Sequence, residues 1–357
     1  MKKKLIVVML LLLSMVLMVP SVFAASDLPK DHRFYEEITY LMDEGIVSGY
    51  SNGTVQPDKL VTRAEAAIMI ARLKGFSGAQ QETKFSDVPK SHPASGYIAE
   101  AVKAGLLSGY PNGTYNPDAP IIRGDMAMIV QRVFDLGLTG QWQFKDVSSN
   151  MKAYAAIQTM LLGNITIGYP DMTFRSDVKV TRGQFSAFLS RGMEPKFKND
   201  ATIPNSYLRD KTKVYVIQGS GEQVTHTYKL HTIDASLPAE FMWVLENNVN
   251  DTVTAIVESE SYDGYSIGFP YSESFNDLAY PVKIGKKFVY KYLGLYDKET
   301  RTITGVNVTV KTLYKTFTNA TEVTDQKGNK YYYAEGHGQI KRINAAGTVT
   351  SQLVDIR

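Results

Sequence analysis

A segment of about sixty residues occurs three times in the first two hundred positions, and it constrains the fold more than any other feature. Each copy contains a Gly-Tyr pair, an aspartate 23 residues before that tyrosine and an arginine 13 residues after it. The three sets are Gly49, Asp27 and Arg63; Gly109, Asp87 and Arg123; and Gly168, Asp146 and Arg182. Repetition at a fixed period indicates one structural unit that is copied and packed against itself. Because polar residues recur in the same register, we expect a repeated binding site.

Each copy has the plan helix, long loop, helix. In the second copy, apolar residues recur at helical spacing from Tyr97 to Leu106, and again from Met126 to Val133. Between them, residues 108–118 are rich in glycine, proline and asparagine, which is typical of a structured loop.

The second helix of each copy begins at the repeated arginine. Thr62 with Glu65, and Thr181 with Gln184, form the pattern of a capping box. The second copy has Ile122 at the capping position, so we expect its helix start to be weaker by about 1 kcal/mol.

An arginine at the first helical position is mildly unfavourable against the helix dipole, so stability alone does not select it. A helix N-terminus beside a guanidinium group suits a carboxylate or a phosphate. The alternative is that each arginine pairs with an aspartate of a neighbouring copy, such as Asp87 or Asp146. Local chemistry favours neither interpretation.

The motifs of this region resemble bacterial S-layer homology repeats. The matching segments are Phe85-Ser-Asp-Val, Phe144-Lys-Asp-Val, Gly49-Tyr-Ser-Asn-Gly-Thr, Gly109-Tyr-Pro-Asn-Gly-Thr-Tyr-Asn-Pro and Val61-Thr-Arg-Ala-Glu. The resemblance implies an all-α, pseudo-threefold assembly with the first helices in a central bundle. It also implies binding of an anionic secondary cell-wall polysaccharide that is linked to peptidoglycan and carries a pyruvylated sugar. In such repeats the motif arginine contacts the pyruvate carboxylate, a role that passes here to Arg63, Arg123 and Arg182.

The other candidate ligand contacts each have a structural explanation as well. Gly49 and Gly109 would let the backbone approach a sugar, but loop geometry explains them equally well. Asp87 and Asp146 are candidate contacts, although bracing the fold or the arginine is the favoured interpretation. The third loop departs most from the pattern, with Met172 in place of the turn glycine. We therefore expect the sites of Arg63 and Arg123 to be the functional ones.

The ends and the composition of the chain predict a secreted protein. Residues 1–24 have the basic start, apolar stretch and small-residue end of a signal peptide. Without Lys2, Lys3 and Lys4 the mature chain has 39 − 3 = 36 basic and 36 acidic residues. This neutral balance argues against nucleic-acid binding. With no cysteine, no later apolar span and no sorting tail, we expect no membrane insertion after signal cleavage, and release or non-covalent attachment at the cell wall.

The predicted fold class is α+β with several domains. The boundaries follow the sequence texture: signal peptide 1–24, repeats 25–83, 84–143 and 144–194, linker 195–206, and a mainly antiparallel β domain at 207–357. Strands are expected at 212–218, 224–233, 252–259, 287–296, 303–314 and 330–334, with a hairpin turn at 324–329. One short helix is expected at 237–247. Residues 312–319 and 331–341 resemble a terminal hairpin of secreted bacterial β domains of unknown function.

No catalytic, cofactor or metal motif stands out in the β domain. His226 and His231 are expected on opposite faces of a strand, which argues against a shared metal. Glu258 and Glu260 are expected on its solvated side. The leading hypothesis is a non-enzymatic surface protein whose repeats bind wall polysaccharide and whose β domain is displayed outward. The alternatives are a wall-anchored enzyme that acts on carbohydrate or peptidoglycan, and a subunit of a surface lattice.

Overall fold

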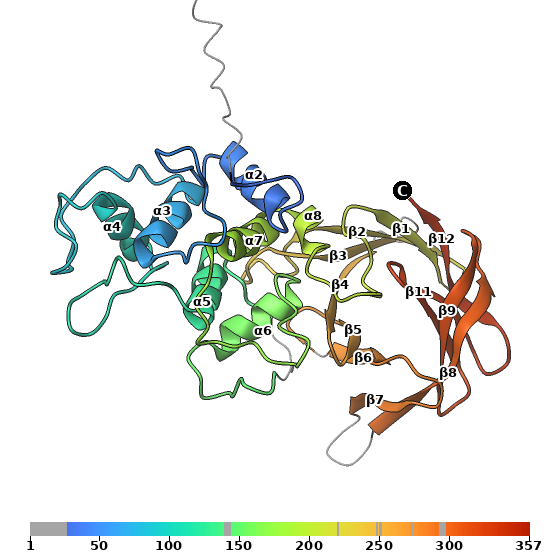
Figure 1. The fold of residues 1–357 in the computed structure, drawn as a ribbon. Coiled ribbons are helices and arrows are strands. Elements are labelled where there is room, and N and C mark those ends of the chain that lie inside the picture. The colour runs from blue at the N-terminus through green and yellow to red at the C-terminus, as the bar shows by residue number, and fades with distance from the viewer. Residues whose placement is uncertain are drawn as a thin grey trace, which may run out of the picture.

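The computed structural model describes residues 27–138, 144–219, 221–247, 249, 252–272, 274–292 and 298–357. The predicted signal peptide lies outside these residues. Helices make up the N-terminal part and strands the C-terminal part, which confirms the α+β prediction (Figure 1). No helix among the described residues combines the length and the apolar character needed to cross a membrane.

Each repeat contributes two helices to the N-terminal part, and a short helix follows the third repeat. In the described residues these helices are α2 (Tyr35–Asp43), α3 (Arg63–Leu73), α4 (Ser95–Lys103), α5 (Arg123–Val133), α6 (Tyr154–Leu162), α7 (Arg182–Met193) and α8 (Pro195–Lys198). Both predicted capping boxes are present, because Thr62 and Thr181 each accept a bond from the third amide of their helix. At α5, Ile122 offers no such cap.

The missing cap at α5 gives a direct test of the helix start. Replacing Ile122 with Thr should stabilise the protein by up to about 1 kcal/mol, because the hydroxyl would accept a bond from an amide of the first turn. Ile122→Val is the matched control, since valine has the shape of threonine without the hydroxyl. Thermal unfolding of the two variants measures the difference. Equal stability of the threonine and valine variants would contradict the prediction.

Backbone hydrogen bonds join the three repeats in a ring. Val61 N donates to Val180 O (3.0 Å), Val180 N to Ile121 O (2.9 Å) and Ile121 N to Val61 O (3.0 Å). All three side chains are buried. The repeats are therefore related by a pseudo-threefold axis, as the resemblance implied. The closest helix pairs join the second helix of one repeat to the first helix of the next: α3 with α4, α5 with α6, and α7 with α2. The expected central bundle of first helices is wrong, because the ring directly precedes the second helices α3, α5 and α7, and α5 packs against α7.

The C-terminal part is one antiparallel sheet. Its strands are β1 (Val214–Gln218), β2 (Gln223–His231), β3 (Glu240–Asn247), β4 (Thr252–Ser261), β5 (Gly264–Gly268), β6 (Ser274–Ala279), β7 (Lys287–Tyr292), β8 (Lys298–Lys311), β9 (Thr316–Asp325), β10 (Lys330–Ala334), β11 (Gly338–Ile343) and β12 (Val349–Ile356). The order across the sheet is β6-β5-β4-β3-β2-β1-β12-β11-β10-β9-β8-β7. The sheet curls strongly, so that an ion pair between Asp277 of β6 and Arg301 of β8 connects its two end regions (3.3 Å; Figure 1).

The short helix predicted at 237–247 is wrong, because this segment contains strand β3. Phe241, Val244 and Leu245 have helical spacing, which suggested one apolar stripe. The segment instead pairs along its length with β2 and β4. Met242, Trp243 and Val244 are consecutive and buried, so both faces of the strand are covered. Pairing between strands has overridden the local helical pattern.

The helical part and the sheet are packed against each other. Leu138 and Leu162 form an apolar cluster with Val257 of β4, and Asn164 Nδ2 donates to Glu258 O (2.8 Å). Residues 195–206, expected to be a linker, begin with α8, whose Phe197 and Lys198 are buried. Lys198 Nζ donates to Gly163 O (2.7 Å), and burial lowers the pKa of this lysine to about 7. The connecting segment is thus part of a packed junction.

The expectation that Glu258 and Glu260 lie on a solvated strand face is also wrong, since each is only 1% exposed. Val257 faces the helical part, so the alternate residues Glu258 and Glu260 point to the other side of β4, inside the curled sheet. The curl of the sheet encloses the face of β4 that carries Glu258 and Glu260, and the helices cover the face that carries Val257. The local sequence of β4 does not indicate that either face is buried.

Candidate functional site

The repeated arginines each reach across to the following repeat. Arg63 Nε donates to Tyr115 O (2.7 Å) and its Nη2 to Ser108 O (2.7 Å). Arg123 Nε donates to Phe174 O (2.9 Å), and Arg182 Nε donates to Val55 O (2.9 Å). We call these contacts junction 1 (repeats one and two), junction 2 (repeats two and three) and junction 3 (repeats three and one). Each repeated arginine thus contacts the Gly-Tyr loop of a different repeat.

The tyrosine of each Gly-Tyr pair lies against the arginine of the preceding repeat. The guanidinium carbon lies 5.1 Å from the ring centre of Tyr110 at junction 1, 5.0 Å from that of Tyr169 at junction 2, and 4.8 Å from that of Tyr50 at junction 3. Cations at such distances are attracted to the face of an aromatic ring. A cation beside an aromatic ring is therefore the repeated chemical unit.

The repeated aspartates brace the loop that receives the arginine. Asp87 accepts bonds from Tyr115 N (2.8 Å) and Asn116 N (2.7 Å), and the carbonyl of Tyr115 in turn accepts from Arg63. Asp27 and Asp146 make the same pair of contacts in their own repeats. Although partial desolvation opposes it, these donors hold the pKa of Asp87 below its usual value.

The alternative of an ion pair between repeated arginines and aspartates is therefore not what the described residues form. The arginines bind carbonyl oxygens, and the aspartates bind amides. The two motif residues stabilise the same loop from opposite sides.

Packing within each repeat accounts for the glycines. A Cβ at Gly109 would lie 2.1 Å from the Phe85 ring and 2.6 Å from Thr114 O. At Gly168, which also has φ +73°, the corresponding contact is with Phe144 at 2.3 Å. The first repeat has Ala25 at the phenylalanine position, and a Cβ at Gly49 would meet only Thr54 O at 3.1 Å. Packing thus requires Gly109 and Gly168 to be small, whatever they contact outside the protein, whereas Gly49 has only one tight contact.

The helix N-termini do not supply the free amide donors that the sequence suggested. Arg63 N and Ala64 N donate to Ala119 O (2.9 Å) and Pro117 O (2.8 Å), and the next amide is capped by Thr62. The first two amides of α5 and α7 are engaged in the same way. At α3 and α7, only the guanidinium groups and other side chains therefore remain to bind a ligand, whereas the third amide of α5 has no side-chain cap.

The three junctions differ in how much of this chemistry reaches the solvent. Arg63 is half-buried, whereas Arg123 and Arg182 are 5% and 6% exposed. Tyr110 at junction 1 is 43% exposed. Tyr50 at junction 3 instead donates to Glu65, which also pairs with Lys59 at 2.9 Å. Junction 1 is therefore the most accessible of the three.

Junction 2 carries a second cation. Arg175 lies 3.9 Å from the ring centre of Tyr169 and pairs with Asp171 at 2.9 Å. Burial lowers the pKa of Arg123, which faces the same ring. This junction has the charge to attract an anion, but its repeated arginine is enclosed.

Three segments of the chain match the S-layer homology domain: residues 26–67, 84–127 and 143–186. The chain carries three S-layer homology domains. Their arginine junctions are the contacts described above, and the ring is formed by the helix starts of the three domains. The domains and the relatives that share them identify the chain as a secreted protein of the bacterial cell surface.

The relatives contain these domains in different surroundings. The chain is 30% identical over 167 residues to the cellulosome-anchoring protein of Acetivibrio thermocellus, a match that spans 44% of this chain and 37% of that protein. It is 25% identical over 270 residues to the S-layer protein sap of Bacillus anthracis, across 66% of this chain and 32% of that protein. An endoglucanase of a Bacillus species is 27% identical over 175 residues, 47% of this chain and 18% of the enzyme. The matches thus span between 18% and 37% of these relatives.

Proposed function

We propose that the S-layer homology domains at residues 25–194 hold this protein non-covalently on the cell wall, and that the β domain at 207–357 is displayed outward. The ligand in this proposal is the anionic secondary cell-wall polysaccharide linked to peptidoglycan, with a pyruvylated sugar as the recognised group. The repeated pairing of a guanidinium group with an aromatic ring carries the proposal. A carboxylate binds the first, and the apolar face of a sugar ring packs on the second.

Junction 1 is the primary site of the proposal. Arg63 is already held by two carbonyl oxygens of the next repeat. Ligand binding therefore costs little further side-chain entropy at this residue. Tyr110 offers its exposed ring beside that cation. A fixed cation next to an exposed aromatic surface suits a sugar that carries a carboxylate.

The remaining predicted residues have supporting roles in this proposal. Arg123 and Arg182 serve junctions 2 and 3, whose enclosed arginines make them the weaker sites. Asp87 and Asp146 hold the loops of junctions 1 and 2, and Gly49 and Gly109 allow the loops to fold tightly. In this proposal these four residues determine the shape of the sites, and the backbone of the loops, rather than their side chains, contacts the ligand.

Sedimentation with isolated cell walls tests the proposal. The purified protein should pellet with native walls and remain in solution with walls from which the secondary polysaccharide has been extracted. Soluble polysaccharide released by the extraction should compete with native walls for the protein. Equal pelleting with both wall preparations would refute the ligand assignment.

We propose a non-enzymatic role for the β domain. Glu258, a buried carboxylate within it, is already bound by Arg209, Trp243 and Tyr265, so it is held as a structural acceptor. Related proteins with the same domains include an enzyme, the endoglucanase, so hydrolysis is the alternative. Release of reducing ends or peptides from purified walls by the full-length protein would support that alternative.

A further inference from the structure

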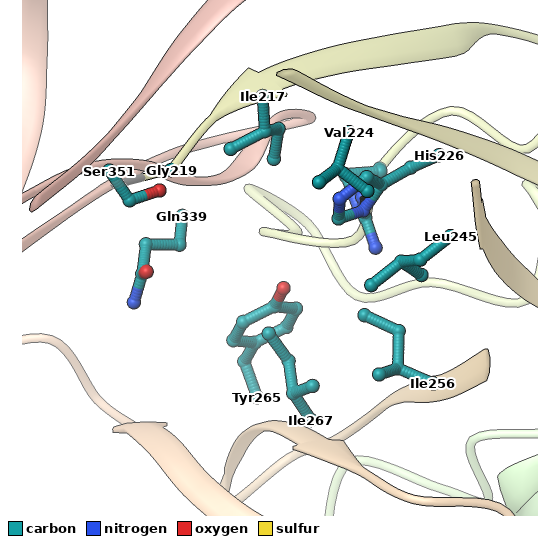
Figure 2. A pocket seen from close by; sticks show the side chains of 11 residues that line it. Ile217, Gly219, Val224, His226, Leu245, Ile256, Tyr265, Ile267, Gln339 and Ser351 are labelled. Carbon is teal, nitrogen blue, oxygen red and sulfur yellow. Dashed lines mark hydrogen bonds between the residues drawn. The ribbon is translucent and has the colours of Figure 1, made fainter. Parts of the chain in front are cut away.

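A cavity of about 290 Å³ lies inside the curled sheet, away from the arginine junctions. Figure 2 shows its lining side chains around an open space, with Gln339 and Ser351 on the side opposite Leu245 and Ile256. Tyr265 and His226 point toward this space from different strands (Figure 2). Its size is just below the range of about 300–1,000 Å³ for ligand sites, which suits a ligand smaller than a typical drug.

One wall of the cavity contains a charged group that is almost fully buried. Arg209 is 4% exposed and donates from Nε to Glu258 Oε1 (3.1 Å). Its guanidinium carbon lies 4.0 Å from the ring centre of Trp243, which also donates to Glu258 (2.8 Å). Tyr265 donates to the same carboxylate. The arginine is thus held rigidly by contacts on one side.

The hydrogen bond between Arg209 and His226 determines what the wall offers to a ligand. Arg209 Nη1 lies 2.9 Å from His226 Nδ1, and a guanidinium nitrogen can only donate. Nδ1 is therefore the acceptor. Burial, together with the nearby Arg209 charge, lowers the pKa of His226 well below its usual value, so the ring is neutral with its proton on Nε2.

The nitrogens Nε and Nη1 of Arg209 are used in these contacts. No described residue accepts a bond from its Nη2. The wall therefore carries an N–H of Arg209 and the Nε2–H of His226 as donors, and it has no free carboxylate, because Glu258 is saturated. Such a wall favours a ligand group that accepts hydrogen bonds.

The rest of the cavity is lined mainly by branched aliphatic side chains. These are Ile217, Val224, Leu245, Ile256 and Ile267, all half-buried. Because these apolar residues are only half-buried, part of their surface is open to a ligand. Covering this surface would stabilise the complex by roughly 25 cal/mol per Å² of apolar area removed from water. The site thus combines an anion-binding end with an apolar body.

We propose that this cavity binds a small organic acid, with its carboxylate at Arg209 and His226 and its aliphatic part against the five apolar residues. The site is separate from the arginine junctions and does not depend on wall attachment. It would give the displayed domain a ligand-binding role of its own.

Octanoate is a suitable probe, and Trp243 a suitable reporter, because Arg209 stacks on its ring. The chain has two tryptophans, so Trp142→Phe leaves Trp243 as the single source of indole fluorescence. In this background, octanoate should change the fluorescence in a saturable way with one site per chain. Octanol, which has the same body without the charge, should bind at least about tenfold more weakly.

A pair of variants on one strand separates cavity binding from other effects. Val224→Phe on β2 adds volume inside the cavity and leaves the charged cluster in place, so octanoate binding should be lost. Thr225→Phe adds a similar side chain on the opposite face of the same strand and should bind octanoate as before. Absence of saturable octanoate binding at low millimolar concentration, equal affinity for octanol, or unchanged binding by Val224→Phe would each overturn the proposal.

Discussion

Replacing Arg63 with Ala should weaken binding to native cell walls by roughly ten- to a hundredfold. The estimate corresponds to about 1.5–3 kcal/mol for the loss of a charged hydrogen-bond partner. Arg63 is the least enclosed of the three repeated arginines, so its removal should have a larger effect than removal of Arg123 or Arg182. Arg63→Lys should recover only part of the affinity, because a lysine lacks the planar fork. The measurement is the fraction of protein that sediments with walls as the protein concentration is varied.

Two further variants distinguish ligand contact from a change in fold. Lys103→Ala removes the same charge from an exposed position in the last turn of α4 and should leave binding unchanged. Tyr110→Ala keeps the arginine and removes the exposed ring, so it should weaken binding without altering the thermal unfolding temperature. Wild-type affinity for Arg63→Ala, or an equal loss in Lys103→Ala, would contradict the assignment of junction 1.

Replacing Arg209 with Met should destabilise the protein by about 3–5 kcal/mol, the cost of leaving a buried charge without its partner. Glu258 would keep its bonds from Trp243 and Tyr265 but lose the positive charge 3.1 Å away. His226 would lose the donor to its Nδ1. The urea dependence of Trp243 fluorescence in the Trp142→Phe background measures the effect.

The double variant Arg209→Met/Glu258→Gln should be more stable than Arg209→Met alone, since it removes the unpaired charge. Arg357 provides the control, because it pairs with Asp355 at 2.9 Å on the exposed surface. Arg357→Met should cost less than about 1 kcal/mol. If Arg209→Met were as stable as Arg357→Met, the buried pair would not hold the interior of the sheet together.

The helical part of the fold was predictable from the sequence because its signals are local and occur three times. The capping boxes at Thr62 and Thr181, and the missing cap at Ile122, can be identified from four consecutive residues. The partner of each arginine was not predictable. The sequence suggested an aspartate of a neighbouring copy as a partner, whereas the ring places Arg63 against Tyr110 and the carbonyl oxygen of Tyr115 in the next repeat. The sequence of a single repeat does not indicate how the next repeat is rotated relative to it.

The β domain shows the limits of local pattern more clearly. Strand β10 was predicted with its observed bounds, and the turn predicted at 324–329 includes the observed turn and the last two residues of β9, because turn residues and β-branched or aromatic content mark these segments. Strands β5, β6, β9, β11 and β12 were not predicted as separate elements. The buried cluster around Arg209 was missed altogether. Alternating Glu258 and Glu260 have the pattern of an exposed strand, and only the curl of the sheet places them inside.

The closed ring of backbone bonds through Val61, Ile121 and Val180 has a consequence for how such proteins can evolve. Each domain completes an arginine–tyrosine contact with its neighbour, and the last domain completes one with the first. Loss of one copy would break this ring and leave two faces without their partners. A side-chain substitution at one junction, in contrast, would change that junction alone and leave the backbone ring closed.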